Sequence, residues 1–222
     1  MSSPIIGIHR FRFDWYKTCL DDGEMGLQLY SQHSFYPLSK QLKPMGPLVR
    51  FDLQIRANRV NERIYSFLEN KTQSNLQSTP FPDTLQSNSS FRVGVYGELG
   101  RGNHSEVLSR DLMCFLNEQR KFGSELQSYW AVFYDTETLS EQEFAKKVWQ
   151  ELAYISQALE LNRMRGLNFS SDPARKNITF YINGDEFFVI GLHRNSADLS
   201  KRFHYATLVF SKDESLYPYQ NH

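Results

Sequence analysis

The sequence has little cysteine, no excess of either charge and no long apolar run. Its two cysteines, Cys19 and Cys114, lie far apart, whereas a disulfide framework or a zinc site needs several ligands at short spacing. They fit a reducing compartment, so we expect a cytoplasmic protein. No stretch of about 18 apolar residues occurs, and the start does not resemble a signal peptide. We therefore expect neither membrane insertion nor secretion.

The charge is balanced, with 25 Lys and Arg against 25 Asp and Glu. A neutral chain gives no reason to expect nucleic acid or another polyanion as a partner. The length of 222 residues suits one domain, 1–222, with a substantial core. Aromatic residues make up 14% of the chain, which favours a well-packed core or a pocket for a flat apolar ligand. The oligomeric state stays open between monomer and homodimer.

The first part of the chain has the weakest pattern. Residues 1 to about 50 mix aromatics, glycines and prolines without a sustained period, and we interpret them as an irregular arm on the main body. From Leu53 to Asn70, apolar residues recur at helical spacing and predict an amphipathic helix. The segment 71–90 is rich in Ser, Gln, Asn and Pro, which predicts a polar surface connection.

Two helices with start signals are predicted in the second half. The alternation in 91–99 predicts a strand, and Asn103 with Glu106 three residues later indicates the N-cap of a following helix. Ser140 and Glu143 form the same capping pattern ahead of a long amphipathic stretch, so we expect a second long helix there.

The remaining elements are strands. The nearly continuous apolar run 128–135 predicts a central strand. Asn183-Gly184-Asp185 divides 177–192 into two β-rich halves and predicts a hairpin, and 205–211 predicts a last strand. This order indicates an α+β fold: a mixed, largely antiparallel sheet with helices packed mainly on one face.

Several familiar catalytic motifs are missing. Gly97, Gly100 and Gly102 have the spacing G-x-x-G-x-G, which matches neither the dinucleotide fingerprint nor a phosphate loop. A simple turn is favoured, although backbone amides at the following helix start could meet an anionic group. No G-x-S-x-G elbow and no H-x-x-x-H pair occurs, which disfavours hydrolysis and a zinc site built from several protein ligands.

One histidine has neighbours that suit a different group. His193 follows the apolar run 187–190 and precedes Arg194, Lys201 and Arg202. A heme iron needs only one axial imidazole, an apolar slot for the macrocycle and cations for its two propionates. Single histidines are more often hydrogen-bonded structural residues, and basic residues after a strand are more often solvated. The residues alone leave both interpretations open.

Three stretches resemble a known family. FYINGDEFFVIGLHRNSADLSKRFHYATLVF resembles the C-terminal signature of the YqcI/YcgG family, in which a strand ends in a motif close to F-V-x-x-x-H-P-x-S-S-R. FPDTLQSNSSFRVGVYGELG resembles the family's F-P-C segment and first strand. ETLSEQEFAKKVWQELAYIS resembles its acidic-aromatic helix. The similarity runs from about Pro80 to Phe210.

The resemblance implies a heme-dependent N-oxygenase, similar to the N-hydroxylases of cycloserine and guanitoxin biosynthesis. Such an enzyme would bind heme b and hydroxylate a nitrogen of a small amine, guanidine or amino-acid-like substrate, using dioxygen and an electron donor. The alternatives are a heme-binding sensor or carrier, a family member that has lost turnover, and a cofactor-free binding module. With heme bound, His193 would ligate the iron, Arg194, Lys201 and Arg202 would neutralise the propionates, and Ser196 would support the loop. His104, at the predicted helix start, is the candidate distal catalytic residue, with a plain helix-start role as the favoured alternative.

The chain departs from the quoted family patterns at four positions. Asp83 stands where the family commonly has cysteine, and Arg194, Ala197 and Asp198 replace a proline, a serine and an arginine of its histidine motif. The acid at 198 bears on propionate or substrate contacts. Glu98 and Asp135, at predicted strand ends, are candidates for holding a cationic substrate.

Overall fold

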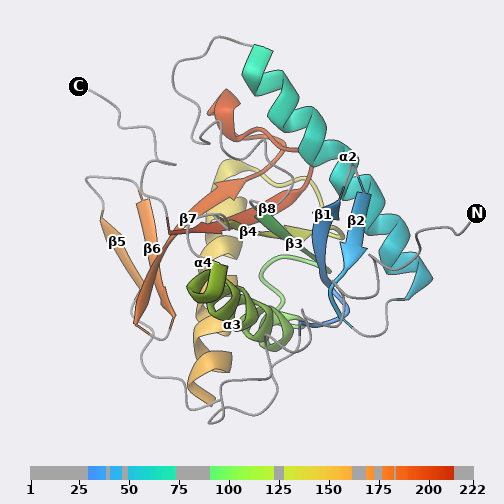
Figure 1. Ribbon diagram of the computed structural model, residues 1–222. Coiled ribbons are helices and arrows are strands. Elements are labelled where there is room, and N and C mark those ends of the chain that lie inside the picture. Colours follow the sequence, from blue (N-terminus) through green and yellow to red (C-terminus); the bar gives the residue numbers. More distant parts are fainter. Residues whose placement is uncertain are drawn as a thin grey trace, which may run out of the picture.

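A computed structural model describes residues 30–38, 41–46, 50–73, 91–122, 128–161, 169–172, 177–182 and 184–212. In these residues eight strands form one sheet, flanked by three long helices (Figure 1). The strands are β1 (Ser34–Leu38), β2 (Gln41–Pro44), β3 (Phe91–Tyr96), β4 (Ser128–Phe133), β5 (Phe169–Asp172), β6 (Asn177–Ile182), β7 (Asp185–Leu192) and β8 (Ala206–Ser211).

The sheet is mixed and mostly antiparallel, as predicted. Its order is β2-β1-β3-β4-β8-β7-β6-β5. β3 and β4 are parallel and are joined through a helix, while the other neighbouring strands are antiparallel. The α+β class is therefore confirmed. The parallel pair matters most for the site, because ligands of such sheets commonly bind beyond the carboxyl ends of parallel strands.

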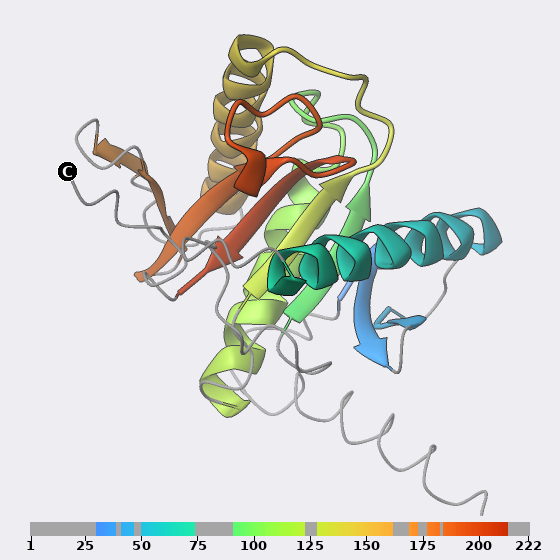
Figure 2. The same ribbon diagram turned by 90° about the horizontal axis from the view of Figure 1, so that it is seen from above.

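The helices cover both faces of the sheet unequally. α3 (Ser105–Phe122) and α4 (Glu141–Leu161) pack on one face. α2 (Phe51–Gln73) crosses the other face, where its apolar stripe meets β3, β4 and β8 (Figure 2). None of the described helices is long and apolar enough to cross a membrane. The stripe of α2 follows helical spacing and consists of Leu53, Ala57, Val60, Ile64 and Phe67.

The helix starts agree only partly with prediction. The capping box is confirmed, since the Ser140 backbone N–H donates to Glu143 Oε2 over 2.9 Å and the Glu143 N–H donates to Ser140 Oγ over 3.3 Å. The cap at Asn103 is wrong. α3 begins at Ser105, and the Leu108 N–H donates to the His104 carbonyl over 2.8 Å, which gives the capping position to His104.

The N-terminal region departs from prediction most clearly. Residues 1–29 lie outside the described residues, but 34–44 contain a hairpin where an irregular arm was expected. β1 extends the sheet by pairing with β3. The hairpin at 177–192 and the last strand are confirmed, with Gly184 at φ 83° in the turn. Most of the predicted connection at 71–90 lies outside the described residues.

Candidate functional site

Most of the polar residues that the sequence singled out lie at one end of the sheet, where several strands finish. We call this end the edge of the sheet. Because β3 and β4 are parallel and β8 is antiparallel to both β4 and β7, the ends of β3, β4 and β7 meet the start of β8 at this edge. Two separate centres lie here. We call them the edge pocket and the histidine pair, the latter being His33 and His104.

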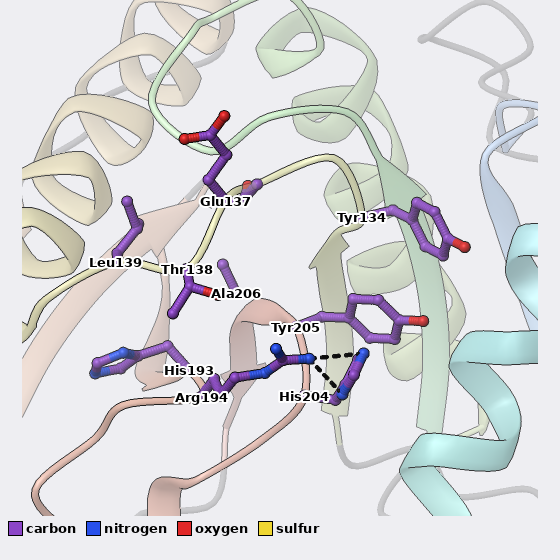
Figure 3. Close-up of a pocket in the computed structure, with 10 residues that line it drawn as sticks. Tyr134, Glu137, Thr138, Leu139, His193, Arg194, His204, Tyr205 and Ala206 are labelled. Atoms are coloured by element: carbon purple, nitrogen blue, oxygen red, sulfur yellow. Dashed lines mark hydrogen bonds between the residues drawn. The ribbon is translucent and has the colours of Figure 1, made fainter.

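The edge pocket lies between the loop after β4 and the segments that follow β7 and precede β8 (Figure 3). Its volume is about 220 Å³. Its ionised wall residues are Glu137 and Arg194, which Figure 3 shows on different sides of the opening. The full lining is Tyr134, Thr136, Glu137, Thr138, Leu139, His193, Arg194, His204, Tyr205 and Ala206.

His193 is held by α4 rather than presented to the pocket. Its ring stacks on Phe144, with ring centroids 4.2 Å apart and planes inclined by 19°. Its Nε2 lies 3.0 Å from Glu141 Oε2. Figure 3 shows the imidazole pointing away from the other lining residues. Nδ1 is buried and has no hydrogen-bond partner among the described residues, so one polar atom of this ring is unsatisfied, which is costly for a buried group.

The basic residues after His193 mostly hold their own loop. Arg202 Nε donates to the Ser196 carbonyl over 2.7 Å. Lys201 Nζ lies 3.9 Å from Asp198 Oδ2, and Asp198 Oδ1 accepts from the Ser200 N–H over 2.8 Å, which caps the short turn Leu199–Lys201. The acid at 198 thus has a local structural role. Ser196 contributes to the loop through its backbone carbonyl, and the predicted role of its side chain stays a prediction.

A heme on His193 does not fit these residues. Because Nε2 is bonded to Glu141, iron could be ligated only by Nδ1, which is buried and points, with the rest of the ring, away from the other pocket residues. Ligand pockets for drug-sized molecules measure about 300–1,000 Å³, and the edge pocket, at about 220 Å³, is smaller than that range. Lys201 and Arg202 are engaged in the loop and do not line the pocket. We therefore assign no chemistry to a heme bound at His193.

Arg194 is the cation that the pocket does present. Its Nη2 lies 2.9 Å from His204 Nδ1 and 3.0 Å from Nε2, and among the described residues it contacts no carboxylate. Burial, together with the positive charges of Arg194 and Arg63, lowers the pKa of His204, which keeps that ring neutral. The positive charge of Arg194 is therefore available to pair with a negatively charged group of a ligand.

The two acids proposed for a cationic substrate are already engaged. Asp135 pairs with Arg56 at 2.6 Å. Glu98 accepts from Lys147 and Arg101, and these bonds lower its pKa. The sequence did not single out Glu137, the acid that lines the pocket. Glu137 lies in the loop after a central strand, but so do the residues beside it, so the sequence pattern could not identify it.

The glycine turn before α3 binds an internal anion. Glu151 Oε2 accepts from the Gly100 N–H over 2.8 Å, and Oε1 accepts from Ser105 Oγ over 2.7 Å. Gly100 and Gly102 have φ of 77° and 74°, which other residues rarely adopt. Burial raises the pKa of Glu151. The prediction of a simple turn is confirmed, and its amides meet a carboxylate of α4 rather than an exogenous one.

His104 does not approach His193. Its ring meets that of His33, with centroids 5.2 Å apart and planes at 72°, and lies beside Tyr96. The structure therefore separates the two histidines that the resemblance placed on one site. His33 was missed, because no local motif surrounds it and its contact with His104 joins residues far apart in sequence.

Comparison with known proteins supports one assignment. No curated protein and no solved structure matches the chain. The model of the YqcI/YcgG family matches residues 72–219, a span that includes the edge pocket and His104 but not His33. Since this match covers well over half of the sequence, the chain belongs to the YqcI/YcgG family.

Proposed function

We propose that the protein binds a small zwitterionic molecule, of the amino-acid type, in the edge pocket. The observation that carries the proposal is Arg194 in the pocket wall without a carboxylate partner among the described residues. An arginine pairs well with a ligand carboxylate, because its guanidinium forms two parallel charge-assisted hydrogen bonds. Glu137 offers the complementary charge to an amine.

The remaining wall suits a small polar ligand. Thr136 and Thr138 supply hydroxyl groups, and Tyr134 and Tyr205 stack on each other at 5.1 Å to close one side. Arg56 lies 4.9 Å from the centre of the Tyr134 ring, which anchors this pair to α2. A volume of about 220 Å³ admits a molecule smaller than a typical drug.

Calorimetric titration of the purified protein with a set of amino acids and guanidino acids tests this proposal. We expect saturable binding for molecules with both charges, and none for the matching amines without a carboxylate. Arg194→Gln should weaken binding by about tenfold or more, the loss of a charge-assisted pair. Arg101→Gln is the matched control, since Arg101 pairs with Glu98 outside the pocket. Equal affinity in Arg194→Gln and the wild type would reject the site.

Heme-dependent hydroxylation of a ligand nitrogen, the activity that the resemblance implies, is a second candidate, and it requires the His193 ring to leave the position that it has in this structure. Its support is family membership and a pocket acid suited to an amine. The candidate requires a Soret band when hemin is added, and an N-hydroxylated product when dioxygen and a reductant follow. A band without product indicates a heme sensor or carrier. A protein that stays colourless rejects both and leaves the binding proposal untouched.

A further inference from the structure

His33 is oriented as metal-ligating histidines usually are. Its Nδ1 lies 2.8 Å from the Val95 carbonyl oxygen, and because a carbonyl only accepts, Nδ1 carries the proton. Nε2 is then left with a free lone pair and has no hydrogen-bond partner among the described residues. In metal sites the second ring nitrogen is typically fixed by such a bond to a backbone carbonyl or a carboxylate.

The backbone around His33 is held by a buried carboxylate. Ser31 donates to Asp111 through its N–H and its hydroxyl, each over 2.6 Å, and Ser31 Oγ in turn accepts from the His33 N–H over 3.0 Å. The His33 carbonyl accepts from the Val95 N–H over 2.9 Å. Tyr96 OH donates to the same carboxylate over 2.9 Å. This network fixes His33 in position against α3.

His104 supplies a second imidazole, whose ring lies edge to face with that of His33. Gly97 leaves room for the ring, because a Cβ at that position would lie 2.8 Å from His104 Cε1 and 3.2 Å from Nδ1. The two rings are thus brought together by three elements, β1, β3 and α3.

We propose that His33 and His104 together chelate one divalent transition-metal ion, such as Cu²⁺, Ni²⁺ or Zn²⁺. Imidazole nitrogen suits these ions. Rings whose centroids lie 5.2 Å apart can each place a nitrogen about 2.0–2.1 Å from a shared ion. No group of three or more His, Cys, Asp or Glu side chains in the described residues is arranged for a metal. Within the part of the chain that the structure describes, the two imidazoles are therefore the protein's ligands, and water or an exogenous ligand completes the coordination.

This site is independent of the proposed function. The edge pocket is lined by neither His33 nor His104, and His33 lies outside the segment that matches the family. The site is placed beyond the carboxyl ends of β3 and β4, a position that commonly receives ligands in sheets with parallel strands.

Titration of the full-length, chelator-stripped protein with NiCl₂ and CuCl₂ tests the site by calorimetry. We expect one ion per chain at the pair, with affinity reduced about tenfold or more in both His33→Asn and His104→Gln, as on loss of one ligand. Asparagine keeps a donor near the Val95 carbonyl while removing Nε2. His222→Gln is the control for adventitious binding and should keep the wild-type affinity.

A second measurement needs no variant. Substoichiometric Cu²⁺ should broaden the Cε1–H proton resonances of His33 and His104 before those of the other histidines, because a paramagnetic ion acts on its nearest nuclei. Wild-type affinity and stoichiometry in both ligand variants, or no ion bound by the wild type, would overturn the proposal. So would broadening that begins at any other histidine.

Discussion

His193 and the histidine pair lie at the same edge of the sheet and differ in what their rings are free to do. The His193 ring is 4% exposed, stacked on Phe144 and bonded to Glu141. His33 instead bonds one nitrogen to a backbone carbonyl and lies edge to face with the His104 ring. Nearby cations in the sequence made His193 the obvious candidate, but its unpartnered Nδ1 is buried, whereas the His33 ring lies edge to face with a second imidazole.

The two centres are also supported by different forces. His193 sits on the apolar side chain of Phe144, whereas His33 depends on buried polar groups that surround Asp111. Burial raises the pKa of Asp111, because a carboxyl group removed from water ionises less readily. Substitutions that remove either the packing on Phe144 or the hydrogen bonds to Asp111 can therefore test whether His193 and the histidine pair act independently.

Asp111→Ala should have the largest effect. It would remove the acceptor for Ser31 and Tyr96, leaving buried donors unpaired, and hydrogen bonds to charged groups each contribute about 1.5–3 kcal/mol. We expect the free energy of unfolding to fall by about 3 kcal/mol or more, measured by urea denaturation. Asp52→Ala, at an exposed ion pair, is the control and should change it by under about 0.5 kcal/mol.

His193→Ala should destabilise the fold by about 2 kcal/mol, in the range of substitutions that empty a well-packed buried site. It removes both the stack on Phe144 and the bond to Glu141. Metal affinity should stay unchanged, because the ring does not contact the histidine pair. A loss of bound Ni²⁺ in this variant would show that the two centres are one.

Gly97→Ala, in contrast to His193→Ala, should weaken metal binding at the histidine pair. The added Cβ would displace the His104 ring from its place beside His33. We expect metal affinity to fall about tenfold, which equals about 1.4 kcal/mol, while ligand binding in the edge pocket is retained. Calorimetry with both ligands measures the two effects, and unchanged Ni²⁺ binding would mean that the ring accommodates the methyl group.

The pKa of His104 should be measurable by NMR and should lie below the ordinary histidine value of about 6.5. A lowered folded-state pKa means that the unfolded chain binds more protons, so this group's contribution to stability is present above about pH 6.5 and is lost as the pH falls through the folded pKa. His33→Asn should raise this pKa partway, since burial, the larger cause, remains. A pKa unaffected by the substitution would argue against contact between the rings.

Glu141→Gln should have the smallest effect. The Glu141 side chain is 59% exposed, and exposed ion pairs contribute about 0–1 kcal/mol. Glutamine keeps an oxygen that can accept from His193, so we expect a change of less than about 0.5 kcal/mol in urea denaturation. A loss comparable to that of His193→Ala would show that the carboxylate, rather than the stack on Phe144, holds the ring.

The fold was predictable where the pattern is local. The capping box at Ser140, the turn at Gly184 and the apolar stripes marked their elements directly. The hairpin at 34–44 was missed because its strands are short and contain prolines. In addition, β1 is stabilised by pairing with β3, which begins more than fifty residues after β1 ends. Such long-range pairing leaves no periodic signal in a short strand.

The site was predictable only in part. Arg194 lines the pocket, and Ser196 contributes to the loop through its backbone carbonyl, which accepts from Arg202. The partners of His193 are 52 and 49 positions away, at Glu141 and Phe144. The meeting of His33 with His104 depends on the register of β1 on β3. Sequence spacing does not predict contacts between residues so far apart, so only the three-dimensional structure shows which histidine rings already have partners.

The hairpin of β1 and β2 has a further consequence for association between molecules. An uncovered strand presents a row of free amides and carbonyls that can pair with another chain. β1 covers β3, and β2 ends the sheet with only four residues and with Pro44, which has no N–H to donate. The segment that matches the family begins after this hairpin, and by itself it would leave β3 uncovered. The hairpin therefore protects the centre of the sheet from addition of a foreign strand.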